Sequence, residues 1–426
     1  MIAALRSLTP ARIKTLATGF AGVHTLNAGL TMIYALAQTL VFSRVLDQRL
    51  YSMAIVATAV GLYLLPLNQS VARANFVVLR ERSVRVSDRG APEAAAAFNL
   101  NQIILLLIPL FVPLTLGVAD RTEYIAFACY LFFTTYSNIW YFEVQMSMMA
   151  VEQALPFERV SFIRRVINYV TLLILLKTRD FLLCNILWAV QTALFHLYVT
   201  QRMARGWGLF DWPHGLTVIS LKRHLVRLWV SLQATGAEWL TLNGPYAVFV
   251  ARFGVGPGVV TIDAVLKLLR IVVSVTRNLS EIALPRVSRA LLMGDAKKGH
   301  LPAILALAGG SVAALACAIA VVFWEHLSFS LLLGPNNVVP PGAGAPAALA
   351  LFAGVGIATG GHIIGYSGDH RSIPILLTTS VVSVCGFVAY VFLTHADIIQ
   401  ALWAASISLA VISATAVGLL VRILRR

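Results

Sequence analysis

One apolar stretch of the chain, residues 259–285, is long enough to cross a bilayer and yet carries five charged side chains. They are Asp263, Lys267, Arg270, Arg277 and Glu281. At about 100° per residue, all five fall on one helical stripe roughly 80° wide. A charge that faces lipid at the centre of a span costs on the order of 2.5–3.5 kcal/mol. We therefore expect this helix to turn its charged stripe towards a polar cavity or a partner helix.

The whole chain has the composition of a polytopic membrane protein. Of its 426 residues, 59% are hydrophobic and only 12% are charged, and the mean hydropathy is +0.81. A soluble domain has about 25% charged residues. The net charge of +15 would point to nucleic acid in a soluble protein. Here an excess of basic residues in cytoplasmic loops accounts for it, so no nucleic-acid partner is expected.

Length and hydropathy predict an all-α fold with twelve transmembrane helices. Their approximate bounds are 17–42, 51–76, 95–118, 122–149, 160–177, 180–202, 226–251, 259–284, 301–327, 344–367, 373–394 and 397–421. The first apolar segment is longer than the core of a signal peptide and is therefore expected to be retained. Most Lys and Arg residues fall in loops that are cytoplasmic if the N-terminus is inside, which predicts that both termini are cytoplasmic.

The chain is predicted to form two related six-helix lobes, residues 1–202 and 226–426, around a central cavity. The connection between them, 203–225, is expected to lie on the membrane surface as an interfacial linker. A docking surface for a partner enzyme is the alternative for this segment. A shift of 208 residues places Arg44 on Arg252, so the polar turn after the first span recurs after the seventh. Such a repeat would relate the lobes by an axis along the membrane normal.

The charged stripe has a structural interpretation beside a functional one. Asp263–Lys267 and Arg277–Glu281 are both spaced i,i+4, and such pairs form readily on a helix face. Pairing of this kind leaves Arg270 without an obvious partner on its own helix. An unpaired arginine within a span favours a ligand path, and a guanidinium suits phosphate.

Polar residues also occur in other predicted spans, and most are expected to form hydrogen bonds between helices. They include His24, Asn27, Asn68, Gln69, Arg73, Asn99, Asn101, Gln102, Glu143, Gln145, Gln233, Glu238, Asn243 and His362. For Arg73 two interpretations stay open, namely reaching towards the interface or lining the cavity. The four cysteines are far apart, and no motif for catalysis, metal or nucleotide binding is present. No catalytic residue, metal or cofactor is therefore expected.

Three short segments carry a resemblance to a known family. They are Arg44-Val45-Leu46-Asp47 followed by Tyr51, then Arg252-Phe253-Gly254, and Leu284-Pro285-Arg286-Val287-Ser288-Arg289 followed by Gly294-Asp295. The chain resembles the Wzx-type polysaccharide flippases of the multidrug/oligosaccharidyl-lipid/polysaccharide (MOP) exporter superfamily. The resemblance implies a bacterial inner membrane protein that translocates an oligosaccharide, such as an O-antigen or exopolysaccharide repeat unit, on undecaprenyl pyrophosphate.

The resulting hypothesis is a transporter rather than an enzyme. Arg270, Lys267, Arg277 and Arg73 are the candidate substrate-binding residues, because an anionic pyrophosphate needs cationic donors along its path. Asp263, Glu238 and Glu143 are candidates for binding a coupling H⁺ or Na⁺. Membrane lipids and other polysaccharide-assembly proteins are the further expected partners. The alternatives are a cation-coupled antiporter of drugs or organic cations in the same superfamily, a membrane-embedded glycan polymerase or ligase, and a scaffold without transport.

Overall fold

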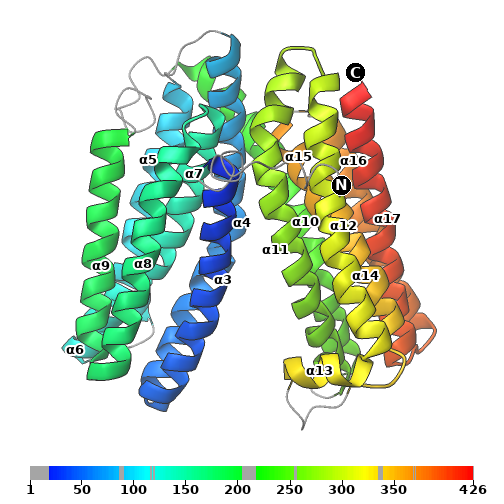
Figure 1. The fold of residues 1–426 in the computed structure, drawn as a ribbon, viewed down its shortest axis with the longest axis horizontal. Helices are drawn as coiled ribbons and strands as arrows, with labels where there is room; N and C mark the ends of the chain where they lie inside the picture. The colour runs from blue at the N-terminus through cyan, green and yellow to red at the C-terminus, as the bar shows by residue number, and fades with distance from the viewer. Residues whose placement is uncertain are drawn as a thin grey trace, which may run out of the picture. The chain divides into compact units, whose positions relative to one another are not determined.

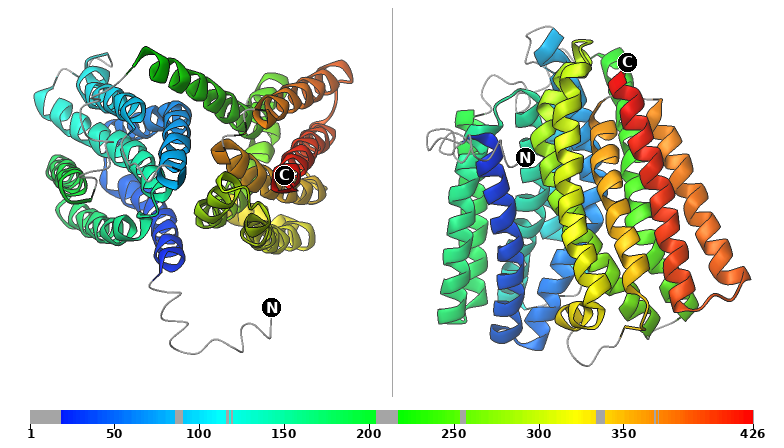
Figure 2. Two further views of the ribbon diagram at one scale, coloured as in Figure 1. Left: turned by 90° about the horizontal axis from the view of Figure 1, so that it is seen from above. Right: turned by 45° about the vertical axis from the view of Figure 1, so that its right-hand side comes forward.

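The computed structural model of the chain describes residues 19–85, 91–115, 118, 120–203, 217–253, 257–333, 339–367, 369 and 371–425 (Figure 1). Every regular element within these ranges is a helix, so the predicted all-α fold is confirmed. The chain divides into two compact units, Met1–Val226 and Arg227–Arg426. Each unit is a bundle in which long helices run alongside one another (Figure 2). Most of the predicted linker, residues 204–216, lies outside the described residues, and residues 218–225 are helical.

Unit 1 has six long helical segments in its described part. They are α3 (Phe20–Val45), α4 (Gln48–Arg85), α5 (Pro92–Thr115), the continuous α6 (Arg121–Leu131), η1 (Phe132–Trp140) and α7 (Tyr141–Ala150), then α8 (Ala154–Thr178), and α9 (Phe181–Tyr198) with η2 (Val199–Met203). The η segments are wider, π-type turns within otherwise α-helical rods. The core of this unit includes a group of aromatic rings, since Trp188 stacks on Phe133 at 5.1 Å and contacts Tyr130 at 6.2 Å.

Unit 2 also has six long helical segments in its described part, with one short helix between two of them. They are α10 (Val218–Phe253), α11 (Pro257–Leu292), α12 (Lys297–Phe323), the short α13 (Glu325–Leu333), the continuous α14 (Gly344–Gly356), η3 (Ile357–Gly361) and α15 (His362–Ser367), then α16 (Ser372–Leu393) and α17 (Ile398–Arg425). Helix α10 begins shortly before the boundary between the units.

The twelve long segments correspond to the twelve predicted spans, but several extend further than hydropathy indicates. Seven of the described helices are long and apolar enough to cross a membrane by length and composition. Helix α8 begins at Ala154 rather than at 160, and α4 continues to Arg85 rather than 76. Both extensions contain charged residues, which lower the mean hydropathy of a window that includes them. The number of such apolar helices in the described part of the chain makes this a multi-pass membrane protein.

The short helix α13 was not expected, because its residues fall partly in a predicted outside loop. Glu325 at its start accepts a hydrogen bond from the backbone N–H of Ala343 at 2.9 Å. That N–H precedes the first turn of α14, where backbone donors lack partners within the helix. A charged side chain within the connection therefore joins α13 to the start of α14, a contact that hydropathy cannot indicate.

Corresponding helices recur at about half-chain spacing in the two units. Helix α3 ends at Val45 and α10 ends at Phe253, 208 residues later, as the repeated turn predicts. Helix α6 begins at Arg121 and α14 begins at Gly344, 223 residues later. Both of these rods are then interrupted by a π-type segment, η1 in unit 1 and η3 in unit 2. Such segments are rare and are found mostly at functional sites or where a helix adapts to its packing.

Close packing around η3 depends on small residues. The backbone of Gly360 lies so near α17 that an added Cβ would meet the carbonyl carbon and oxygen of Ala416 at 2.8 Å. A backbone group cannot rotate away as a flexible side chain can. The glycine at this position is therefore explained by contact with α17.

We expect Gly360→Ala to destabilise the protein by about 1–3 kcal/mol, the usual cost of overpacking a close-packed interior. Gly418→Ala on α17 is the matched control, because a Cβ there would meet no atom within 4 Å. The control should be neutral or more stable by roughly 0.5–1 kcal/mol, because alanine favours helix over glycine. Thermal unfolding of the purified variants measures both, and equal midpoints for the two would contradict the packing argument.

Candidate functional site

The first predicted ion pair of the charged stripe is present on α11. Lys267 Nζ lies 2.7 Å from Asp263 Oδ2, one helical turn away. The two side chains are 46% and 33% exposed, respectively. A pair that is this accessible contributes only about 0.3–0.5 kcal/mol. The lysine therefore remains available to other anions at the surface of unit 2.

Arg277 has a partner that the spacing along α11 did not indicate. Its guanidinium forms an ion pair with Glu238 of α10. The sequence pattern had suggested Glu281, which is four residues further along α11 and is 8% exposed. The i,i+4 rule considers only one helix, whereas this pair joins two helices of unit 2. The contact holds the partly buried Arg277 between two helices of the unit.

Arg270 differs from its charged neighbours on α11. Its side chain is exposed, and it forms no ion pair or hydrogen bond with any other described residue. The exposed Lys267 precedes it by one turn. The two basic side chains therefore form an accessible cationic strip on α11, which we call the α11 basic strip. A strip of this kind attracts an anionic group and repels an organic cation.

Arg73, the fourth candidate for substrate binding, lies in unit 1 on α4. Its side chain is only 2% exposed, so it does not reach out to the surface of its unit. The three other candidates, on α11, belong to unit 2. The proposed role of Arg73 in binding substrate remains a prediction, and its burial shows that it contributes to the interior of unit 1.

Glu143, a candidate for ion coupling, is completely buried in unit 1, where it belongs to a cluster of amides. Asn75 Nδ2 donates to one carboxylate oxygen at 3.1 Å, and Asn101 Nδ2 donates to the other at 2.7 Å. Asn101 Nδ2 also lies 2.6 Å from Asn68 Oδ1. Asn68 in turn donates to the backbone carbonyl of Ile139, within η1, at 3.0 Å. This amide–carboxylate cluster joins α4, α5, η1 and α7.

A second buried carboxylate, Glu158, was missed because the fifth span was predicted to start after it. His24 Nδ1 lies 2.8 Å from Glu158 Oε1, and Gln145 Nε2 donates to the same oxygen at 2.6 Å. Asn27 Nδ2 donates to the other oxygen at 2.5 Å. The interactions join α3, α7 and α8. His24, Asn27 and Gln145 were expected to form hydrogen bonds between helices, and the structure confirms this.

Two arginines, Arg164 and Arg165, also lie within α8. The guanidinium carbon of Arg164, whose side chain is buried, is 4.6 Å from the ring centre of Tyr141 and 5.0 Å from that of Phe195. Arg165 donates a hydrogen bond to Thr31 of α3. A helical repeat of buried polar positions at 158, 161, 164 and 168 runs along this face. Extending this period by one turn beyond the N-terminal end of the predicted span would have revealed Glu158.

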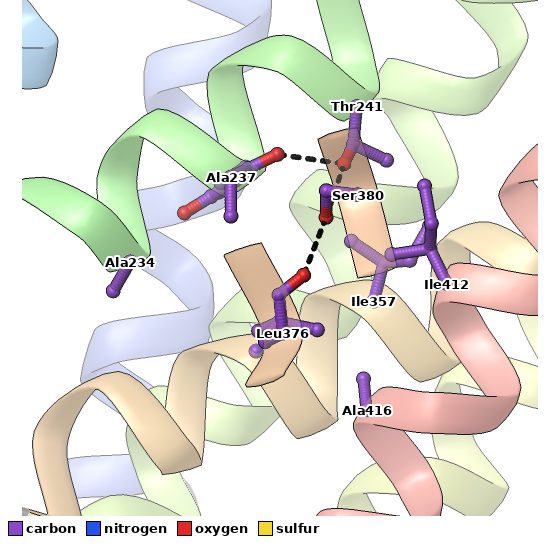
Figure 3. Close-up of a pocket in the computed structure, with 10 residues that line it drawn as sticks. Ala234, Ala237, Thr241, Ile357, Leu376, Ser380, Ile412 and Ala416 are labelled. Carbon is purple, nitrogen blue, oxygen red and sulfur yellow. Dashed lines mark hydrogen bonds between the residues drawn. The ribbon is translucent and has the colours of Figure 1, made fainter. Parts of the chain in front are cut away.

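Glu238 also borders a small pocket inside unit 2. The pocket has a volume of about 10 Å³, roughly the space for one water molecule. Thr241 Oγ1 donates to the carbonyl of Ala237 at 2.6 Å and lies 3.3 Å from Ser380 Oγ on α16 (Figure 3). The pocket is too small for an organic cargo, so it does not by itself form a substrate site.

In the described part of the chain, no three or more His, Cys, Asp or Glu side chains are grouped so that they could hold a metal ion. The cysteines Cys129, Cys184, Cys317 and Cys385 are all free thiols. The chemistry that the described residues offer is therefore the charge and hydrogen bonding of Arg, Lys, Asp, Glu and amide side chains.

Comparison with known proteins shows similarity at the level of fold. No protein-family model matches the chain, and no curated protein sequence matches it significantly. Among solved structures, an outward-facing multidrug-resistance MATE transporter of the MOP superfamily matches with a TM-score of 0.71 at 14% identity, over 95% of this chain and 94% of its own. The eukaryotic MATE transporter AtDTX14 matches with a TM-score of 0.67 at 14% identity, over 96% and 95%.

A third solved structure is relevant to the charge of the site. It is a MOP-superfamily transporter from Pyrococcus furiosus, described as having a binding pocket of reversed polarity that suggests a different function. It matches with a TM-score of 0.70 at 13% identity, over 97% of this chain and 98% of its own. Together these structures show that the chain has the fold of MATE transporters along nearly its whole length.

The two ion pairs on α11 should differ in strength. A double-mutant cycle with Glu238→Gln and Arg277→Gln should give a coupling energy on the order of 0.5–3 kcal/mol, because the pair is partly buried and joins two helices. The cycle with Asp263→Asn and Lys267→Gln should give no more than about 0.5 kcal/mol, because that pair is exposed and screened. Unfolding free energies of the single and double variants in detergent measure both cycles. Equal coupling energies would contradict the inference that the less exposed pair is the stronger one.

Proposed function

We propose that this protein is a transporter of the MOP superfamily that carries its cargo across the membrane by alternating access. The similarity of its fold to MATE transporters, over nearly the whole chain, supports this proposal most strongly. The recurrence of corresponding helices along the chain in the two units is also typical of transporters built from repeats. The buried charges further support transport, since charged side chains within spans usually belong to a path for substrate or ions.

The first candidate for the cargo is an organic cation or drug, exported in exchange for H⁺ or Na⁺. This candidate rests on the solved structures with the same fold, one of which is described as a multidrug-resistance transporter. A cationic cargo requires accessible acidic groups. In this chain Asp263 is paired with Lys267, Glu238 is paired with Arg277, and Glu143 is fully buried. An antiporter would therefore have to release one of these acids during its cycle.

The second candidate is an oligosaccharide linked to undecaprenyl pyrophosphate, moved from the inner to the outer leaflet. The α11 basic strip specifically favours this candidate, because Arg270 and Lys267 present accessible positive charge within a long apolar helix. A guanidinium can bind a phosphate through two hydrogen bonds at once. The Pyrococcus furiosus transporter, described as having reversed pocket polarity, supports the idea that this fold can serve cargoes of different charge.

The cellular location and the partners that we propose follow from the second candidate. We propose a bacterial inner membrane with both termini in the cytoplasm, which agrees with the distribution of Lys and Arg residues. Membrane lipids surround the apolar helices. Other proteins of polysaccharide assembly would supply the lipid-linked cargo on one side and consume it on the other.

One assay on the reconstituted protein separates the two cargoes. Vesicles containing the protein are given either a fluorescent lipid-linked oligosaccharide pyrophosphate or a fluorescent organic cation, with and without H⁺ and Na⁺ gradients. Movement of the pyrophosphate lipid between leaflets supports the flippase, and gradient-driven movement of the cation supports the antiporter. Failure of both substrates to move, in vesicles where the protein is folded, would contradict each assignment.

Replacing Arg270 gives a sharper test of the second candidate. Arg270→Gln should reduce transport of the pyrophosphate lipid about tenfold or more, because a charge-assisted hydrogen bond contributes roughly 1.5–3 kcal/mol. Arg270→Lys should retain part of the activity, because it keeps the positive charge. Arg286→Gln is the matched control, since it removes an exposed arginine from the same helix. If Arg270→Gln transports as well as the control, Arg270 does not bind the cargo.

A further inference from the structure

Glu143 occupies an unusual place for a carboxylate. It lies three residues after the π-type segment η1, and its side chain has 0% exposure inside unit 1. The helices α4 and α8 and the segment η1 all pack against α7, which carries it. A carboxylate that ionises at such a place loses its hydration completely. The surrounding groups must therefore supply the hydrogen bonds and the charge compensation that water would otherwise provide.

The partners of Glu143 are amides rather than cations. Its two oxygens accept hydrogen bonds from Asn75 and Asn101, and no described Lys, Arg or His side chain forms an ion pair with it. Other acids of the helices differ in this respect. Glu158 is bonded to His24, and Glu238 is paired with Arg277. Hydrogen bonds from neutral amides stabilise a buried negative charge only in part, because they leave the net charge in place.

We propose that Glu143 is a binding site for a monovalent cation, H⁺ or Na⁺, within unit 1. When the cation is bound, the buried cluster has no net charge. Asn75 and Asn101 position the carboxylate, and Asn68 connects it to η1. As the coupling site for transport, this assignment rests on the proposed function, but binding of the cation by itself does not.

The amide cluster can serve either cation. For a proton, Glu143 becomes a neutral carboxyl group that keeps one hydrogen bond as acceptor and can donate another. For Na⁺, an asparagine side chain must present oxygen instead of nitrogen, which a half-turn of the amide achieves. Asn75 Oδ1 is buried and has no hydrogen-bond partner among the described residues, so it is one oxygen that a cation could use.

The backbone of η1 is connected to this site through Asn68. The carbonyl of Ile139 accepts the hydrogen bond from Asn68 Nδ2. Interrupted helices provide carbonyl oxygens for Na⁺ or H⁺ in other transporters. Occupation of Glu143 therefore changes hydrogen bonds that lead directly to the π-type segment, which connects α6 to α7.

Other titratable and charged groups lie on η1 and on the helices α4 and α8, which pack against α7. Tyr136 of η1 interacts with it electrostatically, and its hydroxyl lies 3.1 Å from His196 Nδ1. On α4, Arg80 donates to the carbonyl of Ala150 and pairs with Glu152. On α8, Glu158 is bonded to His24, and the buried Arg164 stacks on Tyr141. Arg73 of α4 is also buried.

Thermal unfolding of the full-length protein in lipid nanodiscs tests binding directly. One arm replaces choline chloride by NaCl at constant pH and ionic strength, and the other lowers the pH in choline chloride. A ligand that binds only the folded state raises the unfolding midpoint with its concentration. We expect an increase of about 2–4 °C in at least one arm. The arm that responds identifies the cation as Na⁺ or H⁺.

The variant Glu143→Gln mimics the occupied, neutral site. Its midpoint should be independent of the responsive cation and should at least equal that of the unchanged protein without the cation. Asp295→Asn, which removes an acid from the turn between α11 and α12, is the control and should keep the response. A response that persists in Glu143→Gln, or the absence of a response in both arms, would overturn the proposal.

Two further measurements keep the test decisive if Glu143→Gln fails to fold. Glu143→Asp retains the charge but shortens the side chain, so the apparent affinity for the cation should fall about tenfold, as loss of one good contact implies. In the unchanged protein, infrared difference spectra should show a carboxylic acid band that appears as H⁺ binds or a carboxylate shift as Na⁺ binds. An unchanged affinity together with unchanged spectra would reject the site. Neither result depends on transport of any cargo.

Discussion

An ionised side chain inside an apolar helix bundle must have its charge compensated, and this requirement explains much of the arrangement of both units. In unit 2, Arg277 and Glu238 compensate each other across two helices. In unit 1, Glu158 is held by a histidine and two amides, and these bonds connect three helices. Removing either partner of a buried pair leaves a charge without compensation, which costs several kcal/mol. The same contacts that make the charges tolerable therefore also position the helices.

Arg270 and Glu143 both lack a charged partner among the described residues, and they differ in kind. Arg270 is accessible at the surface of unit 2 and has no described partner. Glu143 is fully buried and has only neutral partners. An exposed cation can attract an anionic group from outside, whereas a buried anion can be neutralised only by a small cation. The first therefore suits cargo, and the second suits H⁺ or Na⁺.

The two units share an architecture but use it for different chemistry. Each has six long helical segments in its described part, and each has a π-type segment in its fourth rod. In unit 1 the polar groups close to that segment are amides and a carboxylate. In unit 2 the corresponding segment, η3, packs against α17 through Gly360 and needs small residues instead. Two units with the same fold can therefore differ in chemistry, so that one binds an ion while the other presents charge to cargo.

The sequence by itself determined the fold class, the number of long helices and the exposed pair Asp263–Lys267, because these depend on composition and on spacing along one helix. Only the tertiary structure decided that Arg277 meets Glu238, that Glu158 is buried, and that Asn75 and Asn101 surround Glu143. Those contacts join residues distant in the chain, and helical period carries no information about which helix lies opposite. The charged stripe on α11 can therefore be predicted from the spacing of its residues along the sequence. The partners of its charges depend on how the helices pack.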